Sequence, residues 1–481
     1  MKRCVFAVIV AGWVYAMASA GAIAGEGDSV WPAWRGPQAD GVAPAANPPV
    51  EWSESKNVRW KIELPGDGLA TPIVWGDFAY IQAAIKTERK AAEPQGDARA
   101  NPEALDAPMG EASPASFVES NQPPPDRRRD GRRGEGRRGR QRKEAPTHIH
   151  EFVLLAIERA TGNIAWRKAL CEERPHESLH PDSTQASNSP ITDGQHIYAY
   201  FGSRGLYSVD LDGHVKWKKD FGDMQTRNSF GEGSSPALHG DTIVINWDHE
   251  GDSFIVALDK QTGRQRWKVD RDEPTSWSTP VIVESGGKPQ VITAASNFVR
   301  AYDLATGDLV WQCAGLTNNV ITSPVAADGM VFVMSSRGGS AVLAIRYEGA
   351  AGDITDSDAV VWRHDKDTPY VSSPLLYGEK LYFLKSTNGI LSCFDTTTGK
   401  ALFDGQRLEG IDGVYASPVG AADRVYIVGR GGKTVVLTRG ETFEPIATNA
   451  LDDQFDASPA IAGNEIYLRG RKQLYCIAEA S

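Results

Sequence analysis

The chain has 481 residues and a formal net charge of -11, with 48 glycines, 28 prolines and 13 tryptophans. The negative charge disfavours general affinity for nucleic acid and argues against nucleic acid as a partner. The many glycines and prolines indicate frequent turns between short strands rather than long helices.

Residues 1–24 have the features of a secretory signal peptide. Lys2 and Arg3 precede an apolar stretch at residues 5–18, which is followed by two small-x-small cleavage sites. This stretch is short for a membrane span, which needs ~20 residues. We predict an exported protein, periplasmic or secreted, with no transmembrane segment after cleavage.

Residues 57–479 are built from a repeat. A Ser/Thr-Pro pair recurs, each time followed by an apolar run, a Gly/Asp turn and a second apolar run, as in SPALHGDTIVINW. Each copy predicts two antiparallel strands joined by a tight turn. Proline is tolerated at the first residue of a strand because no central ladder hydrogen bond is lost there. The eight pairs end at Pro72, Pro190, Pro236, Pro280, Pro324, Pro374, Pro418 and Pro459.

A second signature follows most of these hairpins, as in SVDLDGHVKW and AYDLATGDLVW. An apolar strand ends at an acidic residue, a turn reverses the chain, and a fourth strand carries an aromatic residue. Two hairpins make a four-stranded unit of 41 to 50 residues, the size of a propeller blade. The eight copies predict an all-β, eight-bladed β-propeller.

The two ends of the repeat region predict ring closure. The last copy supplies three strands, and the segment NVRWKIELPG ahead of the first copy has the alternation and the tryptophan of a fourth strand. The N-terminal strand can therefore complete the last blade and leave no open sheet edge at the join.

Six tryptophans occupy matching outer-strand positions, where a large ring can pack against the next blade. Phe403 replaces tryptophan in the sixth unit, and the seventh unit has no obvious counterpart. One repeat position implies one shared role, so structural docking is favoured over cofactor stacking. The predicted docking residues are Trp60, Trp166, Trp217, Trp267, Trp311 and Trp362.

The units ALDKQTGRQRW and AYDLATGDLVW resemble the repeat of the pyrroloquinoline quinone propeller family. That family includes quinoprotein dehydrogenases and an outer-membrane assembly scaffold lipoprotein. The segment WPAWRGPQADGV resembles a leader of exported propellers, so Trp31, Trp34 and Arg35 are expected to anchor residues 25–56 on the propeller. The repeat is a packing device, so this resemblance is specific for the fold and not for an activity.

The first repeat interval contains an insert at about residues 86–147. Its first part is rich in Ala, Pro and acidic residues, and its second part carries ten basic residues between Arg127 and Lys143. With almost no large apolar side chains it is expected to be disordered. It is either a solvated loop or a segment that binds an anionic polymer or surface.

Chain direction places the turns between the second and third strands on the same face as the loops before the Ser/Thr-Pro pairs. These turns predict a rim of cations that binds an anionic ligand, unless these cations simply pair with nearby carboxylates. The predicted rim is Arg204, Arg337, Lys385, Arg430 and Arg471. Five polar residues of the loops are predicted to lie at the mouth of the central funnel: Glu232, Asn318, Asn319, Asp412 and Asp456.

The leading functional hypothesis is a non-enzymatic exported scaffold or binding platform, with a protein of the cell envelope or an anionic polymer as partner. The alternative is a quinoprotein oxidoreductase with an atypical site, which would hold pyrroloquinoline quinone and calcium. We expect no cofactor otherwise, because the adjacent cysteine pair of such dehydrogenases is absent and no catalytic motif is recognisable. The four cysteines after the predicted signal are Cys171, Cys313, Cys393 and Cys476, and three disulfide pairings among them stay open.

Overall fold

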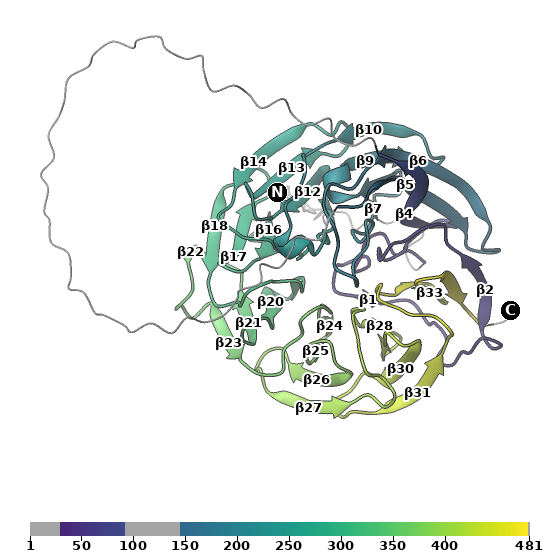
Figure 1. Cartoon of the computed structure of the whole chain (residues 1–481). Coiled ribbons are helices and arrows are strands. Elements are labelled where there is room, and N and C mark those ends of the chain that lie inside the picture. The colour runs from purple at the N-terminus through teal and green to yellow at the C-terminus, as the bar shows by residue number, and fades with distance from the viewer. Residues whose placement is uncertain (1–28, 92–144, 480–481) are drawn as a thin grey trace, which may run out of the picture.

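The computed structural model describes residues 29–91 and 145–479. The predicted signal peptide and most of the predicted insert lie outside the described residues. The described chain is a ring of eight β-sheets around a central axis (Figure 1). The predicted all-β, eight-bladed propeller is therefore confirmed.

The blades follow the chain in order, and each runs from an inner strand at the axis to an outer strand at the rim. Blades 1 to 4 consist of β3 (Ile73–Trp75), β4 (Phe78–Lys90), β5 (His148–Glu158) and β6 (Ile164–Glu173); β7 (Ile191–Thr192), β8 (His196–Tyr200), β9 (Leu206–Asp210) and β10 (Val215–Lys219); β11 (Ala237–His239), β12 (Thr242–Trp247), β13 (Phe254–Asp259) and β14 (Gln265–Asp270); β15 (Val281–Ser285), β16 (Lys288–Ala294), β17 (Val299–Asp303) and β18 (Leu309–Cys313).

Blades 5 to 8 continue the same arrangement around the ring. They consist of β19 (Val325–Ala327), β20 (Met330–Ser335), β21 (Ala341–Arg346) and β23 (Val360–His364); β24 (Leu375–Tyr377), β25 (Lys380–Leu384), β26 (Ile390–Asp395) and β27 (Ala401–Arg407); β28 (Val419–Ala421), β29 (Arg424–Val428), β30 (Lys433–Thr438) and β31 (Pro445–Ala450); β32 (Ala460–Ala462), β33 (Glu465–Arg469), β34 (Gln473–Ile477) and β2 (Val58–Glu63).

The N-terminal strand closes the ring, as the sequence predicted. Strand β2 pairs antiparallel with β34, and Trp60 lies opposite Cys476 in the register. Closure removes the open sheet edge that three strands alone would leave in blade 8. Two short strands extend other blades: β1 (Val42–Ala43) pairs with β28, the inner strand of blade 7, and β22 (Gly352–Asp353) pairs with β18, the outer strand of blade 4.

The docking tryptophans join each blade to the next. The indole N–H of Trp267 donates to the backbone oxygen of Leu304 at 2.8 Å, and its ring packs on Gly307 in the turn before the next outer strand. A Cβ at Gly307, where φ is +81°, would lie 2.8 Å from the indole ring, so the turn needs glycine. Equivalent indole hydrogen bonds to the following blade are made by Trp60, Trp166, Trp217 and Trp362.

Trp311 departs from this pattern. It is fully buried, but among the described residues its indole nitrogen has no hydrogen-bond partner. The following blade lacks the short glycine-containing turn that supplies the carbonyl elsewhere, because residues 347–359 form a longer connection there. Strand β22 of that connection pairs with β18 beside Trp311 instead.

Blade 7 has no docking tryptophan on its outer strand, and Trp52 of the N-terminal tail fills the position. Ala447 stands where the other blades carry the aromatic residue. Trp52 is 4% exposed and stacks on Tyr426 of β29 with ring centroids 6.4 Å apart. The docking ring of Trp60 packs on Tyr467 of its own blade in the same way, at 6.0 Å. The missing counterpart of the seventh unit is therefore supplied from outside the repeat.

The two faces of the ring differ. The loop face carries the loops before the inner strands and the turns between second and third strands. The opposite, tail face is crossed by the N-terminal tail, which pairs at Trp31 with Val74 and continues to Asn47, whose N–H donates to Gly463. Within residues 29–91 and 145–479, no helix is long and apolar enough to cross a membrane.

All four described cysteines are free thiols. Cys313, Cys393 and Cys476 are buried in strands, and Cys171 is partly exposed. Burial raises the pKa of each thiol, to about 11 for Cys313 and to about 12 for Cys393 and Cys476. These thiols are small apolar packing groups rather than nucleophiles.

Candidate functional site

The hydroxyl groups of the repeated Ser/Thr-Pro pairs form a belt around the central shaft. The N–H of Thr71 donates to Ser189 Oγ at 2.9 Å, and the N–H of Ser189 donates to Ser235 Oγ at 2.9 Å. The same bond recurs at five further joints between neighbouring blades, at 2.8–2.9 Å. At these seven joints a hydroxyl fixes the spacing between two inner strands, which explains why Ser or Thr recurs before proline. The buried hydroxyl of Thr71 has no hydrogen-bond partner among the described residues.

A second tier of side chains stands above this belt, toward the loop face. Each blade contributes the residue two positions before its Ser/Thr, and all eight line a cavity of about 370 Å³, the upper chamber. These residues are Leu69, Ser187, Gly233, Trp277, Ile321, Val371, Tyr415 and Asp456. The belt residues are all Ser or Thr, whereas the second-tier residues differ from blade to blade. The walls of the upper chamber are therefore chemically different from one another.

One wall of the upper chamber holds a charged network. Arg430 donates to Asp456 at 2.5 Å and to Asp182 at 2.7 Å, and its guanidinium lies 3.9 Å from the ring centroid of Tyr415. Arg471 donates to the same Asp456 carboxylate at 2.6 Å. The Arg430 hydrogen bond is the largest cause that holds the pKa of Asp182 below its ordinary value. Asp182 belongs to the loop between β6 and β7, which therefore reaches blades 7 and 8.

The predicted rim cations share the loop face but do not form an unpaired positive patch. Arg204 is buried and pairs with Glu173 and Asp223, whereas Lys385 pairs with Asp367 at 2.8 Å. Arg430 and Arg471 belong to the network just described. Arg337 is exposed, lies 6.0 Å from the ring centroid of Tyr370 and makes no ion pair with any described residue.

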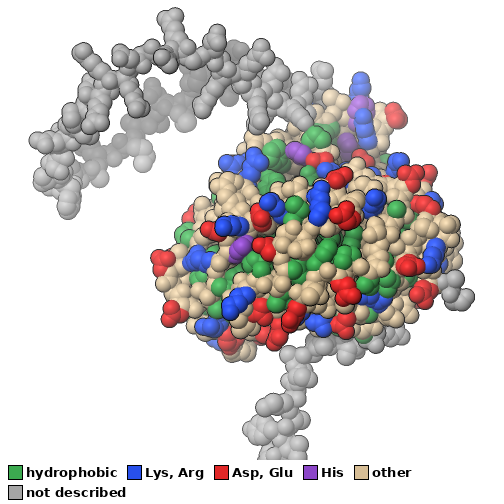
Figure 2. Space-filling model, turned by 90° about the horizontal axis from the view of Figure 1, so that it is seen from below, with side chains coloured by type: hydrophobic (Ala, Val, Ile, Leu, Met, Phe, Trp, Pro, Cys, Tyr) green, Lys and Arg blue, Asp and Glu red, His purple; other side chains and the backbone are tan. Residues whose placement is uncertain are grey.

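Charges are also mixed on the side of the ring. Figure 2 shows acidic and basic side chains interspersed with apolar ones on the surface that faces the viewer. No described surface in this view is dominated by one sign of charge. Among the predicted rim cations, Arg337 alone makes no ion pair with a described residue.

The predicted funnel residues separate in the structure. Glu232 and Asp456 line the upper chamber, whereas the Asp412 side chain is fully exposed outside it. Asn318 is exposed beside Arg337, and Asn319 is buried and accepts a hydrogen bond from Arg227. Two of the five predicted residues therefore line one cavity.

The sequence reasoning missed the aromatic residues of the chamber. Trp277 and Tyr415 occupy the second-tier position, and Phe230 and Tyr370 lie beside them on neighbouring loops. The repeat could have predicted Trp277 and Tyr415, since the position two residues before each Ser/Thr faces the axis in every copy. Asp182 had no such signal, because it lies in a loop that does not repeat.

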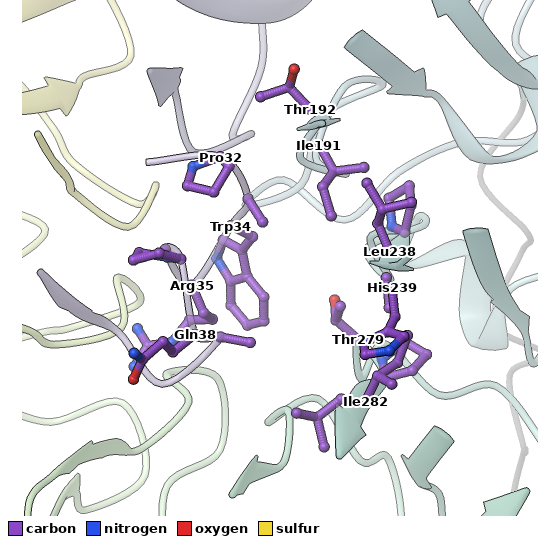
Figure 3. Close-up of a pocket in the computed structure, with 18 of the residues that line it drawn as sticks. Pro32, Trp34, Arg35, Gln38, Ile191, Thr192, Leu238, His239, Thr279 and Ile282 are labelled. Carbon is purple, nitrogen blue, oxygen red and sulfur yellow. The ribbon is translucent and has the colours of Figure 1, made fainter. Parts of the chain in front are cut away.

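The tail closes the other end of the shaft. The buried guanidinium of Arg35 donates to the backbone oxygens of Pro374 at 2.8 Å and Pro418 at 3.0 Å, and burial lowers its pKa to about 10. Trp34 lines both the upper chamber and a second cavity of about 460 Å³ on the tail face. Figure 3 shows its ring across that cavity from Leu238 and Ile282.

The carboxylates of the upper chamber are already engaged, which disfavours a calcium ion there. Asp456 accepts from Arg430, Arg471 and Gln454, and Glu232 accepts from Ser203 at 2.5 and 2.7 Å. Calcium needs six or more converging oxygens. The chamber therefore does not fit the calcium ion that accompanies a quinone cofactor in this fold family. Burial also raises the pKa of Glu232 above its ordinary value.

Elsewhere in the described residues, one group of side chains has metal-ligand spacing. Asp210, Asp212 and His214 lie on the exposed turn between β9 and β10, with one ligand atom of each within 4.8 Å of the others. Asp210 already pairs with Lys216 at 2.7 Å and caps the turn through the N–H groups of Asp212 and His214. These carboxylate contacts account for the turn without a metal ion.

Comparison with known proteins gives one family and a set of structural neighbours. The family model described as outer membrane protein assembly factor BamB matches residues 151–251 and 251–481. The assembly factor BamB of Yersinia pestis is 22% identical over 328 residues, 59% of this chain and 79% of that protein. BamB of Francisella salina is 30% identical over 106 residues, 22% of this chain and 18% of that protein.

Two solved structures are similar to this chain at low sequence identity. A europium-containing methanol dehydrogenase has a TM-score of 0.59 and 8% identity, covering 94% of this chain and 98% of that chain. BamB of Moraxella catarrhalis has a TM-score of 0.47 and 15% identity, covering 67% of this chain and 90% of that chain. At these identities the likeness concerns the fold alone.

Proposed function

Because the chain belongs to the family of outer membrane protein assembly factor BamB, we propose that it is a non-enzymatic scaffold of the cell envelope that acts on outer-membrane protein assembly. The family match carries this proposal, since it takes in most of the ring. The carboxylates of the upper chamber support it, because Asp456, Asp182 and Glu232 are already engaged with the protein's own side chains. Its proposed location is the periplasm.

The loop face is the proposed partner surface. It holds the irregular features of the ring: the long strands β4 and β5, the β6–β7 loop and the mouth of the upper chamber. The tail face is partly covered by the chain's own N-terminal segment. A protein partner therefore finds more accessible and more distinctive surface on the loop face.

Deletion of the protein in its own host tests the proposal. The amounts of folded outer-membrane proteins should fall and should recover when the wild-type chain is restored. A photo-crosslinking residue at the fully exposed Asp412 on the loop face should capture an assembly protein, whereas the same residue at Glu284 near the tail face should not. Unchanged outer-membrane proteins after deletion would refute the scaffold function.

The alternative is a quinone-dependent oxidoreductase. It predicts that the purified chain, supplied with pyrroloquinoline quinone and Ca²⁺, acquires the absorption of a bound quinone. The scaffold proposal predicts a spectrum that is the sum of the separate components. This measurement separates the two functions without knowledge of a substrate.

A further inference from the structure

The upper chamber offers a ligand three kinds of contact: hydroxyl donors, an aromatic wall and carboxylate acceptors. Its lower end carries the belt hydroxyls of Ser189, Ser235, Thr279, Ser417 and Ser458. Each accepts one backbone N–H from the neighbouring blade, and none donates its own proton to another group in the described part of the chain. A hydroxyl polarised in this way is a good donor, so several O–H groups are available to a ligand at the chamber's lower end.

The second kind of contact is an aromatic wall held in a fixed orientation. The indole N–H of Trp277 donates to the backbone oxygen of Gly231 at 2.6 Å, so the polar edge of the ring is satisfied within the protein. Phe230 lies 6.5 Å away at an interplanar angle of 33°. With its edge held, Trp277 is pre-organised to stack on a ligand rather than to donate to it.

The third kind of contact comes from the opposite wall. Trp277 precedes blade 4 and Asp456 precedes blade 8, so they lie on opposite sides of an eight-bladed ring. Asp456 and Asp182 stay fixed by Arg430, yet each carboxylate oxygen can accept more than one hydrogen bond. A ligand stacked on Trp277 would thus meet acceptors across the chamber and donors at its lower end.

This arrangement excludes several ligand classes. A metal ion would compete with the arginines for Asp182 and Asp456. A polyanion would meet those two carboxylates, with Arg337 the one rim cation that lacks a described ion pair. A purely apolar ligand would leave the belt hydroxyls desolvated without partners, which costs about 1–3 kcal/mol for each buried group.

We propose that the upper chamber binds a neutral saccharide, one or two sugar residues long. A pyranose ring has a C–H face that packs on an indole and equatorial hydroxyls that both donate and accept. The cavity of about 370 Å³ lies within the usual range of small-molecule sites, roughly 300–1,000 Å³. Such a site would let the ring hold the end of an envelope glycan as well as a protein partner.

Isothermal titration calorimetry on the full chain tests this assignment. The probes are N-acetylglucosamine, its β-1,4-linked disaccharide, cellobiose and maltose, with a sulfated heparin disaccharide as the anionic comparison. We expect saturable heat with at least one neutral sugar and little change in affinity with added salt. Ser235→Ala removes one belt donor and should weaken binding about threefold to tenfold, in line with the net worth of a single hydrogen bond.

Trp277→Ala should weaken binding about tenfold or more, as expected for loss of a stacking ring and its buried surface. Trp277→Phe should restore part of the affinity, which a purely structural role in folding would not explain. Trp75→Ala is the matched control, since Trp75 is also half-buried but lies at the tail face. Failure of all four neutral sugars to bind at ~10 mM, or salt-sensitive binding of the heparin disaccharide alone, would overturn the proposal.

Discussion

Replacing Trp52 by alanine should destabilise the ring as strongly as removing a docking tryptophan of the repeat. Trp52 is 4% exposed, stacks on Tyr426 and donates its backbone N–H to Asn449 at 2.8 Å. A buried indole removes roughly 150–250 Å² from water, and emptying such a site costs about 3–5 kcal/mol. Ala447 beneath it is too small to fill the gap. We therefore expect Trp52→Ala to lower the free energy of unfolding by about 3–5 kcal/mol.

Chemical denaturation followed by far-ultraviolet circular dichroism measures this loss without relying on tryptophan emission. Trp267→Ala is the matched comparison, since Trp267 is 8% exposed and docks within the repeat. Trp34→Ala removes a partly exposed tail tryptophan and should cost clearly less. If Trp52→Ala costs under about 1 kcal/mol while Trp267→Ala costs about 3–5, the tail does not serve as a docking element.

Three further outcomes follow from the same contacts. Deleting residues 1–63 removes β2 and exposes the edge of β34, so the protein should aggregate or melt without cooperativity; unchanged melting would contradict closure. The pKa of Asp182 is lowered, so its stabilising bond with Arg430 is present above pH 3.8 and lost as pH falls through the lowered pKa. Arg430→Met should flatten that acidic part of a melting-temperature profile. The pKa of Glu232 is raised by burial, so its ionisation destabilises the fold as pH rises above 4.5, and Glu232→Gln should remove this decline.

The ring was predictable because nearly every blade repeats the same local sequence pattern. Turn residues, strand alternation and the spacing of tryptophans recur in each unit, and each contact of the repeat joins neighbours. The belt of Ser/Thr hydroxyls explains why the residue before each proline stays the same. Closure of the ring by β2 was also predictable, because NVRWKIELPG carries the same pattern as the other outer strands.

The contacts that break the repeat were not predictable in the same way. Trp52 lies outside the repeat and reaches blade 7 through the tail, so no spacing relates it to Ala447. The loop that carries Asp182 has no counterpart in other blades, yet it neutralises Arg430 on the far side of the shaft. The ion pairs of the rim cations were not predictable either, because partners such as Asp182 and Asp223 lie in loops that do not repeat.

The contrast between the two tiers of the shaft indicates where this ring is specialised. Seven joints between blades use a hydroxyl at the belt, and all eight copies carry Ser or Thr there. The position two residues earlier is not uniform, and it varies from Gly233 to Trp277 to Asp456. If packing alone governed this second tier, small apolar residues would suffice around the whole ring. An aromatic wall instead faces a charged one, and this asymmetry is why the ligand is proposed for the chamber rather than for the outer surface.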